Sequence, residues 1–552
     1  MHDLSRRLTV ARGDEPADVV VRGGRVLSVF TREWLEVDVA VVDGWIAGLG
    51  EYEGREVVDA SGRYVVPGLI DAHMHLESTK LLPDEFARLV LPLGTTAVVL
   101  DPHELANVLG TDGVHWLLDA CEGLPLDFYF MASSSIPASQ FESPRRPLLS
   151  GDLESLLRRR RVLGLAEMMN FPGVISGDAN ELEKLALAQG VHVDGHAPGV
   201  LGRALNAYAA AGIRSDHEAL TVEEGRERLR NGMWLLIREA SMARNLHALL
   251  PLVEEFGTNR IAFCTDDRDP EDIAENGHIN GMVREAVASG VAPEDAIVLA
   301  TLNPATWHRL WHLGGIAPGY QADLLLLPDL ESFAPELTLK SGRPISEIPE
   351  PDVPEWVKHS VRNQPVSPAD FRIQWGGGKA RVIGLVPDQV VTDLLEEEPG
   401  EDLATIAVVE RHLGTGRIGL GFVRGSGLER GALASTVAHD AHNIIVIGRD
   451  EGDMAYAVTR LGELGGGIVV VDGGEVTAEL PLPVAGLLAD APLTEVIAKS
   501  LACNDAARAL GWSGATPFLT LSFLGLSVIP SLKITDRGLV DVDRFEIVPL
   551  RV

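Results

Sequence analysis

The sequence predicts an α/β protein with a (β/α)8 TIM-like barrel, a small β-sandwich built from both flanks of that barrel, and an additional C-terminal α+β domain. Three observations predict this arrangement. Apolar runs alternate with helical patterns between about residues 67 and 312, as expected of repeated strand–helix units. Short strands with tight turns precede this stretch, and a similar pattern returns after it. A linker rich in proline and charge then leads into further strands and helices.

The length calls for several domains. A chain of 552 residues is too long for one hydrophobic core, and three domains are expected. We place the β-sandwich at residues 1–66 plus 313–365, the barrel at 67–312 and the C-terminal domain at 366–552. A hydrophobic content of 46% and a mean hydropathy of +0.11 indicate a chain that folds and buries its apolar residues.

Charge and cysteine content argue against several classes of protein. The formal net charge is −33, so we expect no binding to nucleic acid or to an anionic membrane, whereas a neutral nucleobase is not repelled. No apolar run is long enough to cross a bilayer, and the N-terminus lacks the apolar core of a signal peptide. The three widely spaced cysteines fit a reducing cytoplasm, where we expect the protein, better than a disulfide scaffold.

The first flank of the predicted barrel reads as a series of β-hairpins. Its short apolar runs are separated by Gly23-Gly24 and Asp43-Gly44, dipeptides typical of tight turns. The segment after the barrel, GGIAPGYQADLLLL from Gly314, has a similar character. We therefore expect the two flanks to form halves of one β-sandwich.

Eight apolar runs predict the strands of the barrel itself. They begin at residues 69, 96, 128, 162, 191, 213, 234 and 261, with helical patterns between them, for example at 180–190 and 223–231. Most runs end in polar clusters such as DPHE, SDHE and TDDR. Functional groups of such barrels lie at the C-terminal ends of the strands, so these clusters are expected at one mouth of the ring.

The segment PGLIDAHMHLE, residues 67–77, is the one around which the rest of the chain is organised. A short strand here ends in His73-Met74-His75. Alternate residues of a strand point the same way, so the two imidazoles share one face and can bind one cation. Two histidines at this spacing also occur by chance on solvated strands, and the downstream residues decide between these interpretations.

Ligand-type residues follow at the ends of later predicted strands. A hydrolytic site with two metal ions needs several ligands and one bridging carboxylate. The chain offers four imidazoles and two carboxylates, a donor set that suits Mn²⁺, Fe²⁺ or Zn²⁺. We predict two divalent ions, with Mn²⁺ and Fe²⁺ ahead of Zn²⁺. The predicted ligands are His73, His75, Glu167, His196, His217 and Asp266.

The chain resembles the amidohydrolase superfamily and, within it, the adenine deaminase family, over nearly its whole length. The resemblance rests on PGLIDAHMHLES, GTTAVVLDPHELANV, GLAEMMNFPGV, DGHAPGVLGRALNAYAAAGIRSDHE, GMWLLIREAS, TDDRDP, ATLNPA, IAPGYQADLL and IGLGFVRGSGLERGALASTVAHDAHNIIVIG. Many superfamily members bridge their metals with a carboxylated lysine at strand four. This chain has Glu167 there, as adenine deaminases do, which argues against dihydroorotase and hydantoinase. His196 is followed by APG, unlike the corresponding histidine of mononuclear adenosine-type deaminases.

The resemblance implies hydrolytic deamination of adenine to hypoxanthine and ammonia. Metal ions lower the pKa of bound water, and the resulting hydroxide attacks C6 of the purine. Asp266 is expected to hold the nucleophile, accept its proton and pass that proton to the leaving amine. His217 and Glu77 are counted with Asp266 as catalytic residues. The superfamily also suggests a homo-oligomer, a dimer or larger.

Other polar residues at strand ends are candidate substrate contacts. Glu77 is expected to read the purine ring or to protonate N1; the alternative is a helix-capping carboxylate. Asp101 and His103 are expected to contact substrate, relay a proton or hold a further ion; the alternative is support of neighbouring ligands. The same alternatives, contact or support, apply to Asn170, Asp216, Arg238, Glu239 and Ser241.

Two further questions stay open in the sequence. The loop His439-Asp440-Ala441-His442-Asn443 has the spacing of a ligand pair and is either a plain strand-edge loop or, as the resemblance suggests, a loop that reaches the barrel mouth. The alternatives to adenine deamination are a related amidohydrolase acting on another aminopurine or a cyclic amide, and a non-catalytic binding member of the fold.

Overall fold

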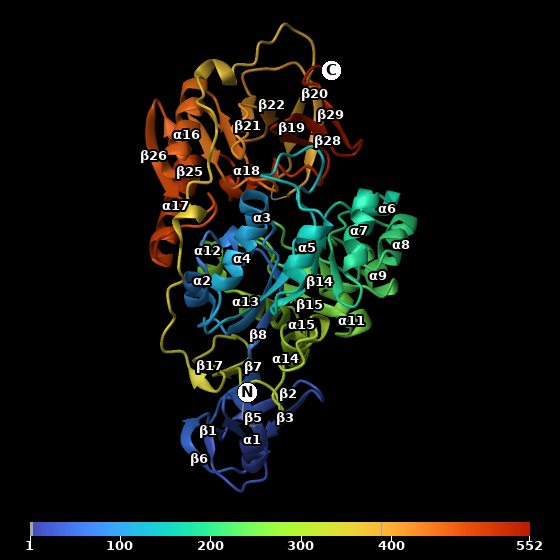
Figure 1. The fold of residues 1–552 in the computed structure, drawn as a ribbon, viewed down its shortest axis with the longest axis vertical. Coiled ribbons are helices and arrows are strands. Elements are labelled where there is room, and N and C mark those ends of the chain that lie inside the picture. Colours follow the sequence, from blue (N-terminus) through green and yellow to red (C-terminus); the bar gives the residue numbers. More distant parts are fainter. Residues whose placement is uncertain (1–3, 388) are drawn as a thin grey trace.

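The structure is a computed structural model that describes residues 4–387 and 389–552. It is elongated, with three parts arranged along its long axis (Figure 1). The N-terminal sheets lie at one end, the strands and helices of the middle segment lie at the centre, and the C-terminal part lies at the other end.

Two sheets form the N-terminal end of the molecule, and helix α1 (Leu4–Ala11) packs beside them. The first sheet has the order β5-β4-β1-β6, and the second has the order β18-β17-β16-β7-β2-β3. Their strands are β1 (Ala17–Arg22), β2 (Arg25–Ser28), β3 (Glu33–Glu36), β4 (Asp38–Val42), β5 (Trp45–Gly50), β6 (Gly54–Asp59), β7 (Tyr64–Pro67), β16 (Leu324–Leu327), β17 (Leu337–Lys340) and β18 (Arg343–Pro344).

Segments from before and after the barrel share the second of these sheets. Strand β16 pairs antiparallel with β7, so a chain segment near residue 325 is tied to one near residue 65. Buried side chains of both sheets, among them Val21, Val41, Val65 and Leu324, form one apolar cluster. The two flanks therefore fold together, as the repeated turn pattern predicts, and they hold both ends of the middle segment at one place.

Eight strands form the centre of the middle segment. One parallel sheet has the order β12-β11-β10-β9-β8, and another has the order β13-β14-β15. The strands are β8 (Leu69–Met74), β9 (Thr95–Leu100), β10 (Asp127–Ala132), β11 (Val162–Met168), β12 (His192–Gly195), β13 (Ser215–Asp216), β14 (Trp234–Arg238) and β15 (Ile261–Cys264). All eight predicted strands are present, although β13 is much shorter than its apolar run.

Backbone contacts join the two sheets into a ring. The N–H of Asp266, just after β15, donates to the carbonyl of His73 in β8 at 3.0 Å, and Met74 and Asp266 form a parallel bridge. On the other side, the N–H of Arg214 donates to the carbonyl of Val193 in β12 at 3.2 Å. The strand ends that carry the predicted ligands therefore meet at one mouth.

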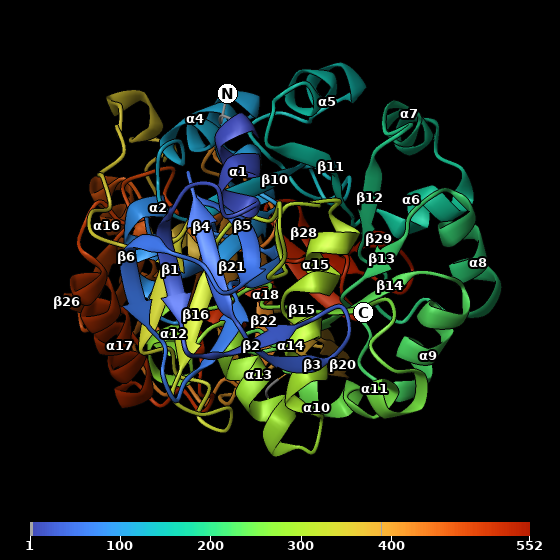
Figure 2. The same cartoon turned by 90° about the horizontal axis from the view of Figure 1, so that it is seen from below.

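Helices lie outside this ring, as Figure 2 shows from below. Their amphipathic sequences place apolar residues against the strands, and the predicted helices at 180–190 and 223–231 are present as α7 and α9. The helices of this part are α2 (Pro83–Val90), α3 (His103–Leu109), α4 (Thr111–Ala120), α5 (Ser150–Leu157), α6 (Phe171–Ser176), α7 (Ala179–Leu187), α8 (Gly202–Ala210), α9 (Val222–Arg230), α10 (Leu246–Leu249), α11 (Pro251–Phe256), α12 (Pro270–Asn276), α13 (Ile279–Ala288), α14 (Pro293–Leu299) and α15 (Leu302–Trp307).

An eight-stranded sheet, in the order β20-β19-β22-β21-β24-β23-β25-β26, dominates the C-terminal part. A three-stranded sheet, β27-β28-β29, lies beside it. The elements are β19 (Ala380–Leu385), β20 (Thr392–Glu397), β21 (Ala404–Val409), β22 (Ile418–Arg424), β23 (Ala432–Ser435), β24 (Ile444–Gly448), α16 (Glu451–Leu464), β25 (Gly467–Asp472), β26 (Glu475–Pro481), α17 (Leu493–Ala509), α18 (Pro517–Phe523), β27 (Leu532–Thr535), β28 (Gly538–Asp541) and β29 (Glu546–Val548).

The C-terminal part packs on the mouth of the ring. Buried side chains from both sides, such as Leu105, Leu117, Leu488 and Phe518, belong to one continuous apolar cluster. Polar contacts cross the same boundary: the N–H of Ala489 donates to the carbonyl of Lys80 at 2.8 Å. Whatever lies at the mouth is therefore enclosed from two sides.

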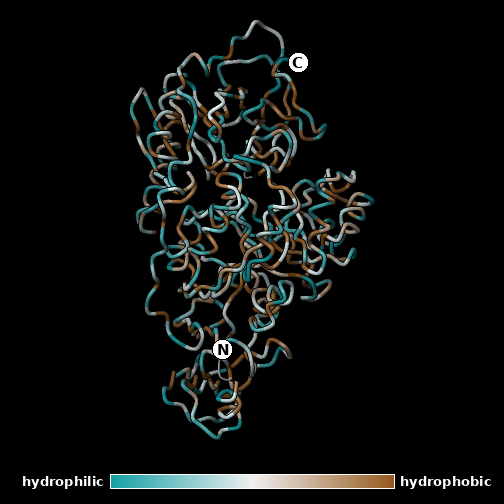
Figure 3. The backbone as a smooth tube through the Cα atoms, viewed as in Figure 1, coloured by the Kyte–Doolittle hydropathy of each residue, from teal (hydrophilic) through white to brown (hydrophobic). Residues whose placement is uncertain are grey.

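Apolar stretches of the chain are short and are spread over all three parts, as the hydropathy colouring of Figure 3 shows. Among the described residues, none of the helices combines the length and the apolar character needed to span a bilayer.

Close packing of neighbouring barrel strands yields a test. A Cβ on Gly164 of β11 would lie 2.2 Å from the backbone oxygen of His192 in β12, so Gly164→Ala forces the strands apart. We expect a loss of about 1–3 kcal/mol, seen as a fall of about 2–4 °C per kcal/mol in the thermal midpoint. Gly151→Ala in α5, where a Cβ meets nothing within 4 Å, is the control and should be neutral or stabilising. An unchanged midpoint for Gly164→Ala would contradict this packing.

Candidate metal-binding active site

Two histidines at the end of β8 begin the site. His73 and His75 are buried, and their rings lie 4.9 Å apart. Nδ1 of His75 lies 2.9 Å from the backbone oxygen of Asp101, an acceptor that requires a proton on Nδ1. The Nε2 atom of His75 is then unprotonated and available as a ligand, which is the usual arrangement for a metal-binding imidazole.

The carboxylate of Glu167, at the end of β11, stands at the centre of the site. Its Oε1 lies 3.3 Å from Nε2 of His75 and 3.8 Å from Nε2 of His73. Its Oε2 lies 2.8 Å from Nδ1 of His196 and 3.3 Å from Nε2 of His217. Each oxygen thus faces a different pair of imidazoles, which is the geometry of a carboxylate that bridges two cations.

Asp266 completes the group from the end of β15. Its Oδ1 lies 3.0 Å from Nε2 of His75 and 3.6 Å from Nε2 of His73. Its Oδ2 accepts a hydrogen bond of 2.9 Å from Arg238, whose guanidinium also contacts Glu218. The arginine therefore fixes the rotamer of Asp266 and leaves one carboxylate oxygen directed at the histidines.

Electrostatics in this cluster favour cations. Burial raises the pKa of Glu167, but hydrogen bonds to His196, His217 and His75 outweigh burial and lower that pKa well below its ordinary range. Burial alone would lower the pKa of His217, yet the hydrogen bond to Glu167 and the nearby carboxylates raise it to about 9. The carboxylates are thus held as anions in a buried place, where positive charge is needed to balance them.

The residues fit divalent metal ions. Groups of three buried ligand atoms lie within 4.8 Å of one another, including His73–His75–Asp266 and His73–Glu167–His217. Nε2 of His73 and Nε2 of His196 are buried without a hydrogen-bond partner. Imidazole and carboxylate donors together suit Zn²⁺, Mn²⁺ and Fe²⁺. All six predicted ligands are brought together at one mouth of the ring.

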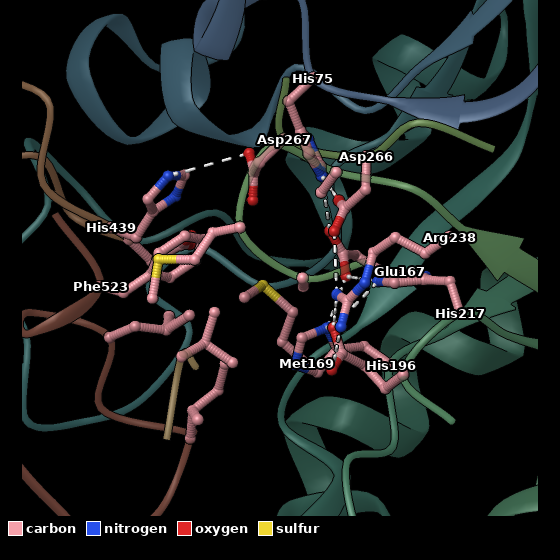
Figure 4. Close-up of a pocket in the computed structure, with 18 of the residues that line it drawn as sticks. His75, Glu167, Met169, His196, His217, Arg238, Asp266, Asp267, His439 and Phe523 are labelled. Carbon is pink, nitrogen blue, oxygen red and sulfur yellow. Dashed lines mark hydrogen bonds and ion pairs between the residues drawn. The ribbon is translucent and has the colours of Figure 1, made fainter. Parts of the chain in front are cut away.

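A cavity opens in front of these ligands. Figure 4 shows the ligand residues on one side, and His439 and Phe523 of the C-terminal part on the other. Apolar side chains form much of the lining: Met169, Met242, Val390, Phe523, Leu526 and Ile529. A pocket with an apolar wall opposite a charged floor suits a flat, mostly apolar ring with a polar edge.

The wall from the C-terminal part is tied together by Lys533 of β27. Its amino group is buried and donates to the carbonyls of Val390 and Phe523, at 2.7 and 3.0 Å. Burial lowers the pKa of Lys533 to about 7. One side chain thus fixes the positions of two lining segments that are far apart in the sequence.

The loop from His439 to Asn443 reaches the barrel mouth, which decides between the two interpretations of it. His439 and Asp440 line the cavity. Nε2 of His103 lies 2.9 Å from Oδ1 of Asp440, so the loop meets α3 of the barrel part directly.

Three predicted substrate contacts are placed away from the cavity and hold the backbone instead. Asn170 caps α6 by accepting from the N–H of Gly173 at 3.0 Å. Asp216 accepts from the N–H of Ala197 and from the buried guanidinium of Arg228, each at 2.9 Å. The hydroxyl of Ser241 donates to Asp272 at 2.7 Å. None of these three is among the residues that line the cavity, which supports the alternative role that the sequence left open for them.

Glu77 and Asp101 also lie behind the lining. The carboxylate of Glu77 is buried and accepts from the N–H of Leu105 in α3 at 3.0 Å, a helix-capping contact. Asp101 accepts from the hydroxyl of Ser133 at 2.7 Å, and its other oxygen lies 3.3 Å from Nδ1 of His103. Of the candidate contacts outside the ligand set, His103 and Arg238 are therefore the two that line the cavity.

Several lining residues were not predicted from the sequence. Glu218 and Asp267 each directly follow a ligand, His217 and Asp266, so the clusters SDHE and TDDR do contain a signal for them. The apolar lining of Val390, Phe523 and their neighbours has no such signal. These residues belong to another part of the chain and are brought to the barrel only by tertiary packing.

Comparison with known proteins agrees with this geometry. A model described as "Amidohydrolase family" matches residues 64–345, and one described as "Adenine deaminase C-terminal domain" matches residues 385–546. A protein of Carboxydothermus hydrogenoformans named adenine deaminase 2 is 45% identical over 568 residues, covering 100% of both chains. A protein of Desulfatibacillum aliphaticivorans named adenine deaminase is 47% identical over 561 residues, covering 98% of this chain and 99% of its own.

The chain belongs to the adenine deaminase family of amidohydrolases. The full-length match extends through the C-terminal part, which supplies one wall of the cavity. A solved structure of an adenine deaminase is 15% identical, with a TM-score of 0.45 over 56% of this chain and 89% of its own.

The buried Lys533 predicts a pH dependence of stability. Its pKa is about 7 in the fold, against an ordinary value of 10.5. Between these values the unfolded chain binds the proton and the folded chain does not, so the free energy of unfolding rises with pH through this window. We expect the wild type to gain stability over Lys533→Met between pH 7 and 9.5, measured by thermal unfolding. Parallel pH profiles for the two proteins would refute the assignment.

Proposed function

We propose that this protein hydrolyses adenine to hypoxanthine and ammonia at a site that holds two divalent metal ions. The observation that carries the proposal is the placement of Glu167, whose two oxygens face separate pairs of histidines. Relatives at about 45% identity over the whole chain bear the name adenine deaminase, so the alternative substrates considered above are not favoured. A cytoplasmic, homo-oligomeric enzyme remains part of the proposal.

Six side chains would hold the ions. His73, His75 and Asp266 surround one position, His196 and His217 surround the other, and Glu167 lies between them. Divalent ions here would lower the pKa of water and so supply hydroxide near neutral pH. The donor set accepts all three ions, and our proposal keeps Mn²⁺ and Fe²⁺ ahead of Zn²⁺.

Asp266 has the position required of the proton carrier. Its Oδ1 faces the histidines and its Oδ2 is held by Arg238, so the carboxylate sits at the floor of the cavity in a fixed rotamer. We assign it to accept the proton of the attacking water and to deliver that proton to the amine leaving C6. Positioned acid–base groups of this kind contribute about 10²–10⁴-fold to the rate.

The cavity explains how a purine is held. The ring would lie between the apolar side chains of Met169 and Met242 on one side and Phe523 on the other, all of which line the cavity. The exocyclic amine would then face the charged floor. This enclosure by the C-terminal part also limits the space available for a sugar attached to the base.

Ammonia release from adenine is the decisive test of the proposal. The metal-replete protein should deaminate adenine, and turnover of adenosine should be far slower. Asp266→Asn should lower kcat by about 10²–10⁴-fold while most metal stays bound, because the amide still offers a ligand oxygen. No ammonia from adenine with a metal-replete sample would reject the function. An unchanged rate in Asp266→Asn would reject only the role of that residue.

Metal content tests the role of Glu167 without measuring activity. Glu167→Gln removes the charge that faces both histidine pairs, so we expect metal retained after dialysis to fall from about two equivalents to less than one. Glu181→Gln is the matched control, because Glu181 is also buried but pairs with Lys184 in α7, away from the cavity. Full metal retention in Glu167→Gln would show that this carboxylate does not bridge the ions.

A further inference from the structure

We propose a third cation site, adjacent to the Glu167-centred site, formed where the C-terminal loop meets the barrel; Nδ1 of His103 faces Oε1 of Glu167 at 3.6 Å, and its Nε2 faces the loop. Its ligands are His103 at the start of α3, and His439 and Asp440 of the loop. Each offers a nitrogen or oxygen, and these atoms lie within 4.8 Å of one another. All three residues are at most 3% exposed.

The contact between His103 and Asp440 has the geometry of two ligands rather than of a hydrogen bond. Nε2 of His103 and Oδ1 of Asp440 are 2.9 Å apart, yet neither atom has a hydrogen-bond partner. Two donors that each lie about 2.1 Å from a common ion are about 3.0 Å apart at an angle of about 90° and about 3.4 Å apart at the tetrahedral angle, with their lone pairs directed at the ion rather than at each other. Nε2 of His439 is also buried without a partner.

Neighbouring groups set the tautomer and the orientation of these ligands. Oδ2 of Asp101 lies 3.3 Å from Nδ1 of His103, which favours a proton on Nδ1 and leaves the Nε2 lone pair free. The side-chain amide of Asn107 lies 3.3 Å from Oδ2 of Asp440 and holds that carboxylate in place. The ring of His439 is stacked on Phe523 at 4.7 Å, which fixes its plane.

The loop itself is held rigidly by buried side chains. The N–H of Ala441 donates to Glu142 at 3.0 Å, and the guanidinium of Arg411 contacts the carbonyl of His442. Nε2 of His412 lies 2.7 Å from the carbonyl of Ala441. Because the loop is anchored on both domains, its ligand side chains are already in position, and little conformational entropy is lost when an ion binds.

A neighbouring cluster, formed by Glu104, His439 and His442, is a weaker candidate. The N–H of Ala438 donates to Nδ1 of His442 at 3.1 Å, so the proton of that neutral imidazole is on Nε2. Nε2 of His442 and Oε2 of Glu104 lie 3.3 Å apart and neither has a hydrogen-bond partner, but the proton on Nε2 leaves that nitrogen no lone pair for an ion. This leaves His103, His439 and Asp440 as the metal-binding set.

The ligand chemistry selects the kind of ion. Two imidazoles and one carboxylate suit Zn²⁺, Fe²⁺ or Mn²⁺ rather than Ca²⁺ or Mg²⁺, which prefer oxygen ligands. All three ligand residues line the cavity, so an ion there is reached through it and keeps an open position toward it. Such an ion would also join the two domains across the substrate pocket.

Anomalous diffraction from crystals of the full chain grown with Zn²⁺ tests this proposal. We expect a peak between His103, His439 and Asp440, separate from the peaks beside Glu167. His439→Asn should abolish this peak and leave the others. His442→Asn is the matched control, because the Asn oxygen can replace Nδ1 as acceptor for Ala438 while the Nε2 group is lost; it should keep all peaks.

If a variant fails to fold, the anomalous map of the wild-type protein alone tests the third site. Peaks beside Glu167 with none at the loop would overturn the third site, and would show that a protonated His103 pairs with Asp440 instead. A third peak that survives in His439→Asn but disappears in His442→Asn would also overturn it, in favour of the neighbouring cluster. Absence of peaks beside Glu167 would refute the two-metal proposal separately.

Discussion

The sharing of one carboxylate between two pairs of imidazoles is the constraint on which the rest of the structure depends. Glu167 can face His75 through Oε1 and His196 through Oε2 only if the first, fourth and fifth strands end at the same level of one ring. The backbone contact between Asp266 and His73 closes that ring at the ligands themselves. The contact that closes the ring therefore also brings the ligands of the site together.

The C-terminal part turns an open mouth into an enclosed pocket. Lys533 ties two apolar lining segments to one amino group, and the loop after β23 brings Asp440 against His103. Exclusion of water from such a pocket strengthens every charge interaction within it. Because these contacts arise from a separate part of the chain, enclosure of the substrate depends on how the two parts pack.

The ligands could be predicted from the sequence because strand geometry alone places them. Alternation puts His73 and His75 on one face, and the order of barrel strands brings the downstream ligands to the same mouth. Polar residues such as Asn170 and Asp216 gave the same local signal, but their side chains satisfy backbone groups at helix starts and loops. The sequence pattern shows where a strand ends, but it does not show in which direction a polar side chain at that end points.

The buried carboxylates at the mouth need positive charge to balance them. Buried carboxylates gather here in excess, and Arg238 is the guanidinium that contacts this group. Burial, and then the neighbouring Glu77, raise the pKa of Glu104 well above its ordinary range, so this carboxyl holds its proton more tightly than a free one. An isolated buried carboxylate is costly unless it is paired or bound to a metal. Divalent cations, which we propose both at Glu167 and at the domain boundary, would balance this concentration of acids. The acids in question are Glu77, Asp101, Glu104, Glu167, Glu218, Asp266, Asp267 and Asp440.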